Sequence, residues 1–114
     1  MDVRETLTLD TPEELRRWLH ENSRDRIEIW LVFYKKNSGR QTLTIHQAVD
    51  EFLCFGWIQS RLKPLNPQSF AVRFSPRHAG SLWSLPNRKR VHRLIAQGRM
   101  TEFGLVVFPE DFKD

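Results

Sequence analysis

The sequence contains a single cysteine, Cys54, among its 114 residues. One cysteine excludes an internal disulfide and any metal site built from several cysteines. No apolar run approaches the roughly 20 residues that a membrane-spanning helix requires. The opening residues MDVRETLTLDTPEEL are charged and lack the apolar segment of a signal peptide. Together these absences predict a soluble, cytoplasmic protein without a transmembrane segment.

Acidic residues are missing from a long central part of the chain. From Phe52 to Thr101 there are nine Lys or Arg residues and no Asp or Glu, and the whole chain has a formal net charge of +4. Protein surfaces usually mix charges of both signs, so fifty residues without a carboxylate indicate cations that bind an external anion. Candidate partners are nucleic acid, acidic lipid, and ligands that carry phosphate or carboxylate.

The sequence also lacks a recognisable catalytic or metal-binding motif. His46, His78 and His92 are too widely spaced to suggest a triad or a set of metal ligands, and no glycine-rich phosphate loop is present. Cys54 lies in FLCFGW, and a cysteine among aromatic residues is more often buried and structural than nucleophilic. We therefore predict no catalytic residue, no metal site and no cofactor.

Asp50 and Glu51 form an adjacent pair of carboxylates in a predicted helix. Neighbouring residues on a helix point in different directions, so this pair is not arranged for joint acid–base chemistry. The simpler interpretation places both side chains on a solvated helix face.

Hydrophobic periodicity predicts a single α+β domain over residues 1–114. Helices are expected at residues 10–22, 44–56, 84–98 and 102–108, and strands at 27–36, 57–65 and 69–75, with a short edge strand at LTLD. The segment IEIWLVFYKK reads as a central strand because both of its faces are apolar. This order indicates a small, mostly antiparallel sheet of three to four strands packed with three to four helices. Trp18, Phe52 and Phe74 are expected in the core.

The helix boundaries are marked by capping residues. Each predicted N-cap is a Thr or Ser, and two of these residues are followed three positions later by Glu or Gln, the pattern of a capping box. Glycines are placed to end two of the helices. The predicted N-caps are Thr11, Thr44, Ser84 and Thr101, and the predicted ends are Gly56 and Gly98.

The two strands 57–65 and 69–75 are expected to form a hairpin. Pairing apolar with apolar residues sets Leu62 opposite Val72 and Arg61 opposite Arg73. Strict alternation then turns Leu62 toward the core. It places Trp57 and the two arginines on the other face, together with Gln59, Lys63 and, from the central strand, Trp30 and Tyr34.

A candidate anion site follows from this register. Directly opposed Arg61 and Arg73 repel each other unless an anion lies between them, and a guanidinium matches phosphate and carboxylate geometry. The loop SPRHAGSLWS then leads to the start of the helix at 84–98, whose N-terminal end also suits an anion. The predicted ligand-binding residues are Arg61, Arg73, Arg77, Trp57, Trp83 and Ser84.

A structural interpretation of the same residues stays open. The helix at 84–98 can cover this sheet face, with Trp57 and Trp83 in the core, since a Trp taken alone is more often a core residue. In that case Arg73 and Arg77 bond backbone carbonyls or the carboxylates of Glu28, Asp50 and Glu51. The cations of the helix are then an ordinary solvated surface.

Four segments resemble the YdeI/OmpD-associated family, also called the bacteriocin-protection family. They are IWLVFYKKNSG, LTIHQAVDEFLCFGWIQS, RFSPRHAGSLWS and RLIAQGRMTEFGL, and the resemblance runs from about Leu9 to Leu105. It implies a single domain of this family, with links to outer-membrane proteins and to survival of envelope stress or antimicrobial peptides. It supplies no catalytic mechanism and no cofactor. The matching positions that can build a site are Trp57, Arg73, Pro76, Arg77, Trp83, Ser84 and Arg99.

The chain departs from the family pattern in three places. Gln59 stands where most members carry Asp, and Leu82 stands where most carry Asn or Arg. Most members also continue into a further helical segment beyond the position of Asp114. The missing Asp leaves Arg61 and Arg73 less compensated, which strengthens the argument for an anion.

The predicted function is a small binding module with a basic, Trp-containing surface for an anionic partner, such as a phosphate-containing molecule or nucleic acid. A monomer and a homodimer both fit. Two alternatives stay open: an enzyme whose site lies at the same Arg, Trp and Ser cluster, and a protein–protein interaction domain without a small ligand.

Overall fold

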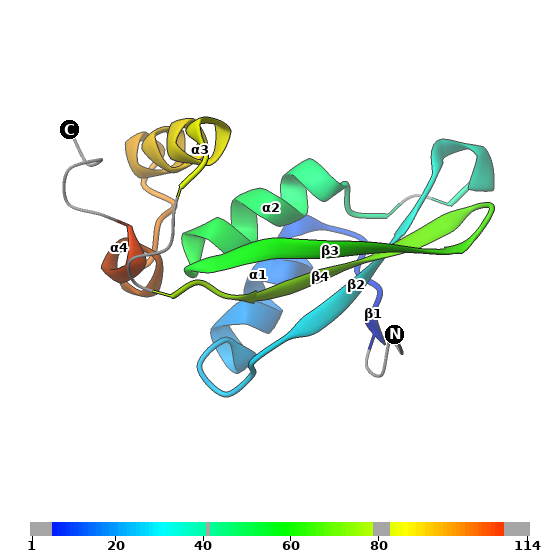
Figure 1. Cartoon of the computed structure of the whole chain (residues 1–114), viewed down its shortest axis with the longest axis horizontal. Helices are drawn as coiled ribbons and strands as arrows, with labels where there is room; N and C mark the ends of the chain where they lie inside the picture. The colour runs from blue at the N-terminus through cyan, green and yellow to red at the C-terminus, as the bar shows by residue number, and fades with distance from the viewer. Residues whose placement is uncertain (1–5, 41, 79–82, 109–114) are drawn as a thin grey trace.

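The structure is a computed structural model that describes residues 6–40, 42–78 and 83–108 (Figure 1). Its elements are β1 (Thr6–Leu7), α1 (Pro12–Asn22), β2 (Ile29–Tyr34), the 3-10 helix η1 (Lys36–Ser38), α2 (Ile45–Cys54), β3 (Trp57–Asn66), β4 (Ser69–Pro76), α3 (Leu85–Ala96) and α4 (Glu102–Val107). The middle of the predicted SPRHAGSLWS loop, including Leu82, lies outside the described residues, as do both ends of the predicted 1–114 domain.

The predicted α+β fold with a mostly antiparallel sheet is confirmed. The strand order is β1-β2-β4-β3, and β2 pairs antiparallel with β4, as does β3. β1, however, runs parallel to β2, so the sheet is mixed rather than purely antiparallel. β1 is an edge strand as expected, but it overlaps the predicted segment LTLD only at Leu7. β2 lies between two strands, as its two apolar faces predicted.

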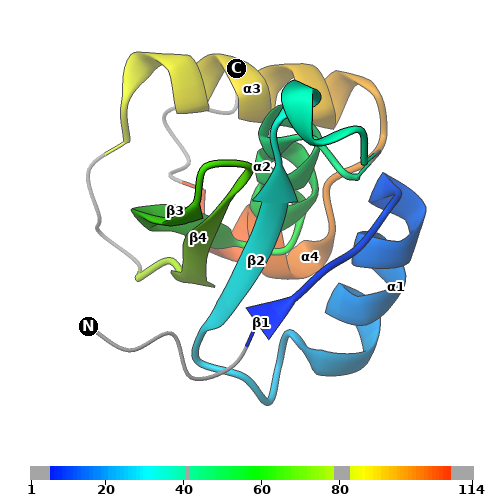
Figure 2. The same ribbon diagram turned by 90° about the vertical axis from the view of Figure 1, so that its right-hand side faces the viewer.

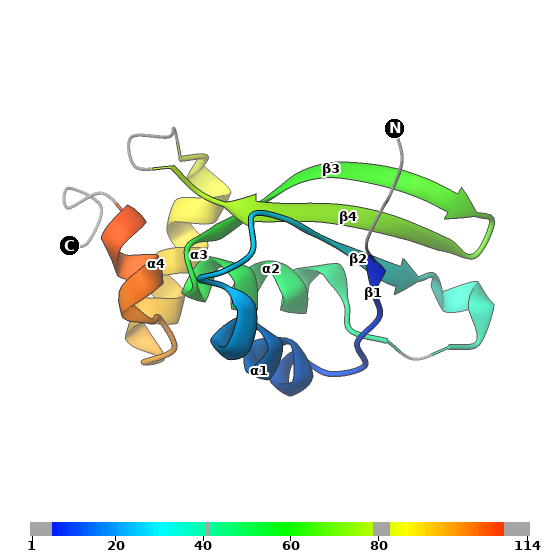
Figure 3. The same ribbon diagram turned by 90° about the horizontal axis from the view of Figure 1, so that it is seen from below.

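Helix α2 is the element against which the others pack. It contacts α1, β3, α3 and α4. Figures 1 and 3 show α1 and α2 along one face of the sheet, α3 and α4 grouped at one end of the molecule, and the β3–β4 hairpin reaching toward the other. Figure 2 shows α1 and α3 on different sides of α2.

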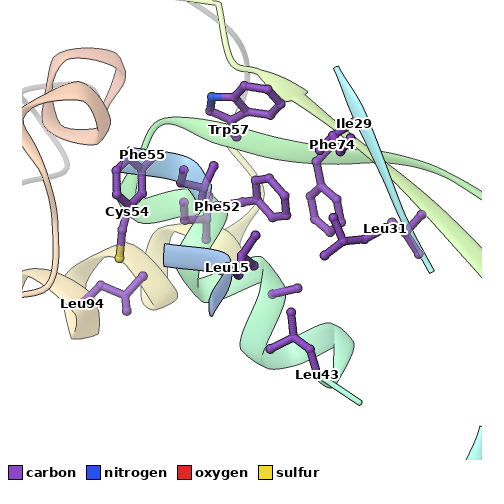
Figure 4. Packing of buried hydrophobic residues seen from close by; sticks show 14 of the residues in the cluster. Leu15, Ile29, Leu31, Leu43, Phe52, Cys54, Phe55, Trp57, Phe74 and Leu94 are labelled. Atoms are coloured by element: carbon purple, nitrogen blue, oxygen red, sulfur yellow. The ribbon is translucent and has the colours of Figure 1, made fainter. Parts of the chain in front are cut away.

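The core fills the space between α2 and the strands (Figure 4). Phe52 of α2 stacks on Phe74 of β4 with ring centroids 3.9 Å apart, and Trp57 packs against Phe52 at 5.7 Å. Phe52 and Phe74 are fully buried, as predicted. Trp18, also predicted in the core, is half-buried and packs edge-on against Trp57 at its margin.

The predicted capping residues are confirmed. Thr11 with Glu14 and Thr44 with Gln47 form complete capping boxes, and Ser84 and Thr101 cap α3 and α4. These local bonds satisfy amides that a helix start leaves without intrahelical partners.

A close backbone approach joins the end of α2 to α4. Gly56, which follows α2 with φ +80°, leaves no room for a side chain, because a Cβ there would lie 2.8 Å from the Phe103 carbonyl oxygen. A Cβ on Gly104 would lie 2.5 Å from the Cys54 carbonyl oxygen. Glycine at both positions therefore lets the two backbones pack in contact.

The β3–β4 hairpin has the predicted register, but the side chains at the start of β3 lie on the other side of the sheet from the one predicted. Arg61 pairs with Arg73 and Leu62 pairs with Val72. A bulge between Gln59 and Arg61 inserts one extra residue into β3, and one extra residue reverses the alternation of side chains before it. Trp57 therefore lies on the core face and is 2% exposed, which corrects its predicted place beside the arginines.

Leu62 shows the second correction. It shares the face of the core residue Val72, yet it is 53% exposed because β3 is an edge strand that extends past the helices. β3 includes Pro64 and ends at Asn66, one residue later than predicted. Proline is tolerated there because an edge strand has one unpaired side. No helix in residues 6–40, 42–78 and 83–108 has the length and apolar character needed to span a membrane.

The core assignment predicts a clear difference between buried and edge residues. Phe52→Ala and Phe74→Ala should each lower the free energy of unfolding by about 3–5 kcal/mol, since each removes a fully buried ring. Leu62→Ala should cost less than about 1 kcal/mol, because its side chain already faces water. Urea unfolding measures all three, and a loss for Leu62→Ala as large as for the phenylalanines would contradict the assignment.

Candidate functional site

The structure separates the six predicted site residues into three places. Arg61 and Arg73 lie on the sheet face opposite the helices, Trp57 lies in the core, and Arg77 lies near Trp83 and Ser84 at the end of β4. They therefore do not form the single basic, Trp-containing surface that the sequence predicted.

Arg73 has an internal carboxylate partner. Its Nε donates to Glu28 at 2.6 Å, and its Nη1 donates to the Ser60 hydroxyl at 3.0 Å. The pair is partly exposed, and Arg61 lies opposite Arg73 in the ladder. The expectation that the cations from Arg61 to Arg93 meet an external anion rather than internal carboxylates is therefore wrong for Arg73.

Arg77 stacks on an aromatic ring. Its guanidinium carbon lies 3.9 Å from the ring centroid of Trp83, which in turn packs edge-on against Phe108 at 5.3 Å. Burial lowers the pKa of the Arg77 guanidinium below its usual value. The backbone amide of Arg77 donates to the Gly56 carbonyl, so this contact fastens the end of β4 to the turn after α2.

Ser84 is used as a cap. Its hydroxyl oxygen accepts the amide of Asn87 at 3.3 Å and so completes the start of α3. A ligand-binding role for Arg77, Trp83 and Ser84 stays a prediction, because their described contacts are structural.

Asp50 of α2 binds two arginines of α3. Arg90 Nη1 and Arg93 Nη2 both lie 2.9 Å from the Asp50 Oδ1, and Arg93 also bonds to Oδ2 at 3.0 Å. Arg90 Nη2 lies 3.0 Å from His46 Nδ1. Both arginines belong to the acid-free stretch, the part of the chain from Phe52 to Thr101 that has no Asp or Glu. They thus have an internal counterion, which corrects the expectation of an external anion for them as well.

Glu51 of α2 binds two further arginines on the other side of the helix. Its side chain accepts from Arg16 Nη1 at 3.0 Å and forms an ion pair with Arg99, while Arg16 Nη2 donates to the Arg99 carbonyl oxygen at 2.7 Å. Glu51 is 3% exposed, so its predicted place on a solvated helix face is wrong. The two carboxylates do point in different directions, as the helical spacing required.

Arg16 is held tightly within this network. Burial disfavours its charged form, but hydrogen bonds and the charge of Glu51 outweigh burial, so the pKa of Arg16 is raised. Its guanidinium carbon also lies 5.3 Å from the centroid of the Phe55 ring. Arg16 and Arg99 line a cleft of about 470 Å³ with Gln47 and Glu51. Because both cations are bound to Glu51, we assign this cleft a structural role.

A second concave surface lies where β2 runs into η1. This groove, of about 690 Å³, lies between the end of β2 and the starts of α1 and α2, which Figure 3 shows at the same end of the molecule. Its lining residues are Asp10, Thr11, Pro12, Phe33, Tyr34, Lys35, Lys36, Arg40, Thr42, Leu43, Thr44, Ile45, Gln47 and Phe70. A hydrogen bond from the Leu43 amide to the Leu9 carbonyl holds the two helix starts together.

Three cations and one carboxylate line this groove. Lys35 and Lys36 are exposed, and the guanidinium carbon of Arg40 lies 4.1 Å from the ring centroid of Tyr34. Within the described ranges, none of these three cations forms an ion pair with a carboxylate. Asp10 is the acidic side chain in the lining. The groove therefore carries an excess of positive charge.

Sequence reasoning missed this groove. The segment KKNSGRQ carries three cations within six residues, Lys35, Lys36 and Arg40, and this is a signal visible in the sequence. The acid-free stretch suggested a different site, because its counterions come from α2 and from Glu28, the residue before β2, and cannot be recognised from the local sequence. Among the described residues no group of three or more His, Cys, Asp or Glu side chains is arranged to hold a metal ion.

Comparison with known proteins gives a family without an assigned function. A family model described as Domain of unknown function (DUF8412) matches residues 7–107, so the chain belongs to that family. No curated protein and no solved structure matches the chain. The resemblance to the YdeI/OmpD-associated family stays a prediction.

The Glu51 network predicts a large loss of stability when its charge is removed. Glu51→Gln should lower the free energy of unfolding by about 2–4 kcal/mol, because two guanidiniums are then left around a buried neutral group. Both arginine side chains are about a third exposed, which places the loss below that of a fully buried pair. As a control, Glu28→Gln should cost no more than about 1 kcal/mol, since Glu28 is 45% exposed. Equal losses in urea unfolding would contradict this difference.

The environment of Cys54 predicts low reactivity. Burial raises the pKa of its thiol above the usual value, so at neutral pH the thiolate fraction is smaller than in an unfolded chain. Raising the pH increases the thiolate fraction of the unfolded chain first and that of the folded protein only later. Alkylation followed by mass spectrometry should therefore be much slower for the folded protein than in denaturant, and equal rates would show that the thiol is accessible.

Proposed function

We propose that this member of the DUF8412 family is a binding module that holds an anionic ligand in the groove beside η1. The observation that carries the proposal is the grouping of Lys35, Lys36 and Arg40 on one concave surface opposite a single lining carboxylate, Asp10. Clustered like charges on a concave surface raise the local concentration of anions and are stabilised when an anion binds.

The groove is a better candidate than the acid-free stretch for an electrostatic reason. Arg73, Arg90 and Arg93 each bond to a carboxylate of the same chain, so an external anion must compete with Glu28 or Asp50. Lysine and arginine at the groove have no such competitor among the described residues. An anion therefore gains more by binding at the groove.

The proposal keeps the predicted class of function and moves its site. An anionic partner was expected from the excess of cations, and that expectation now rests on three residues outside the stretch that suggested it. A role in envelope stress or in protection against antimicrobial peptides, implied by the family resemblance, stays a prediction. No contact described above favours the enzyme or the protein–protein alternative.

Inorganic phosphate, added at constant ionic strength, should raise the melting temperature of the protein. A ligand that binds only the folded state stabilises it by mass action, by about 2.7 kcal/mol at a hundredfold excess over the dissociation constant. The double variant Lys36→Ala/Arg40→Ala should lose most of this gain, because it removes two of the three groove cations. Differential scanning fluorimetry measures the shift, and titration monitored by amide NMR locates it.

A matched control separates a site from a general charge effect. The double variant Arg17→Ala/Lys89→Ala removes the same pair of residue types from exposed positions on α1 and α3, and it should keep the gain. If Arg61→Ala abolishes the gain while the groove variant does not, the anion binds the sequence-predicted sheet face instead. No shift with phosphate in the wild-type protein would also contradict the proposal.

A further inference from the structure

We infer that the ligand of the groove is an amphiphilic anion: one phosphate or carboxylate group joined to an aromatic or short aliphatic body. The inference rests on the proposed function, which concerns only the anionic group. It is carried by the apolar part of the lining, which a simple inorganic ion does not need. The half-buried Ile45 and Phe70 expose this apolar surface, and Phe33 and Leu43, which are buried, also line the groove.

The apolar surface of the groove is preorganised. Phe33 and Phe70 stack with ring centroids 5.6 Å apart and an interplanar angle of 22°, across the antiparallel pair of β2 and β4. Phe33 and Leu43 are each 2% exposed, so the core fixes their positions. A ligand that touches the half-buried Phe70 ring therefore meets a side chain that is already held against the fixed Phe33 ring and loses little further freedom on binding.

The polar and apolar parts of the lining adjoin each other. Tyr34, the last residue of β2, lines the same groove as Phe33 and Phe70, and the guanidinium carbon of Arg40 lies 4.1 Å from the centroid of the Tyr34 ring. Lys35 and Lys36 follow Tyr34 in the chain, so the cations begin where the aromatic side chains end. A ligand with an anionic head and an apolar body matches this order.

The dimensions favour a small molecule over a polyanion. A volume of about 690 Å³ lies within the range of roughly 300–1,000 Å³ that is typical of small-molecule sites. The three cations fall within six consecutive residues, Lys35 to Arg40, and all line this one groove rather than a long track for a chain of phosphates. One anionic group suits this cluster, whereas a nucleic-acid strand requires a basic groove that follows its backbone.

Naphthyl phosphate, inorganic phosphate and naphthol form a set of probes that separates the two parts of the ligand. We expect naphthyl phosphate to bind at least about tenfold more tightly than inorganic phosphate, because tenfold requires the burial of only about 55 Å² of apolar surface. Naphthol, which lacks the anion, should bind more weakly than naphthyl phosphate. Titration calorimetry measures the three affinities.

Contacts and variants then locate the apolar body. Nuclear Overhauser effects should connect the naphthyl protons to the side chains of Phe70 or Ile45. Ile45→Ala should weaken naphthyl phosphate and leave inorganic phosphate unchanged, whereas Lys36→Ala should weaken both. Lys89→Ala, on the exposed side of α3, is the control and should change neither affinity. A single cooperative melting transition of Ile45→Ala confirms that the variant is folded, and the Overhauser contacts test the inference without any substitution.

The affinities distinguish failure of the amphiphilic-ligand inference from failure of the proposed anion site. If naphthyl phosphate binds no more tightly than inorganic phosphate, the apolar body is not recognised and this inference fails, while the proposed anion site stands. If naphthol binds as tightly as naphthyl phosphate and inorganic phosphate does not bind, the proposed function fails. Naphthyl contacts to residues outside the groove also overturn the inference.

Discussion

The ion pairs of Asp50 and Glu51 connect the arginine-bearing segments of the chain to α2. The two carboxylates are adjacent in α2 and point to different sides, so one binds Arg90 and Arg93 of α3 while the other binds Arg16 of α1 and Arg99 after α3. A buried carboxylate is tolerated only with charged partners and satisfied hydrogen bonds, and Glu51 has both. The two groups of ion pairs thus connect α1, α3 and the segment that follows α3 to the central helix α2.

Because of these ion pairs, the cations of residues 52–101 do not by themselves indicate an external anion. Fifty residues without a carboxylate suggested cations in search of an external anion, but several of those cations are neutralised by acids that precede the stretch. A segment of the chain that is rich in cations therefore does not have to form a positively charged surface in the folded protein. The proposed ligand site lies instead at Lys35, Lys36 and Arg40, where the fold brings three cations to one groove beside a single acid.

In the β3–β4 hairpin, one extra residue in β3 changes the side of the sheet on which the preceding side chains lie. Pairing apolar residues gave the right register, because Leu62 and Val72 do face each other. The bulge before Arg61 reverses the alternation, so Trp57 enters the core and packs on Phe52 rather than joining the arginines. Nothing in the local sequence marks the bulge, since Ser60 is neither glycine nor proline and its hydroxyl finds its partner, Arg73, only on the neighbouring strand.

Local chemistry in the sequence determined the helix starts and ends, the central strand and the α+β class. Thr11 and Thr44 bond to amides three residues away, and Gly56 adopts a backbone conformation that glycine favours, so neighbouring residues suffice to specify them. The tertiary structure decided the parallel pairing of β1, the partners of the arginines and the location of the groove. These depend on contacts between residues far apart in the chain: Arg73 lies 45 residues from Glu28 and Arg99 lies 48 from Glu51. Coulomb interactions act through space, and only the folded chain fixes which charges are close.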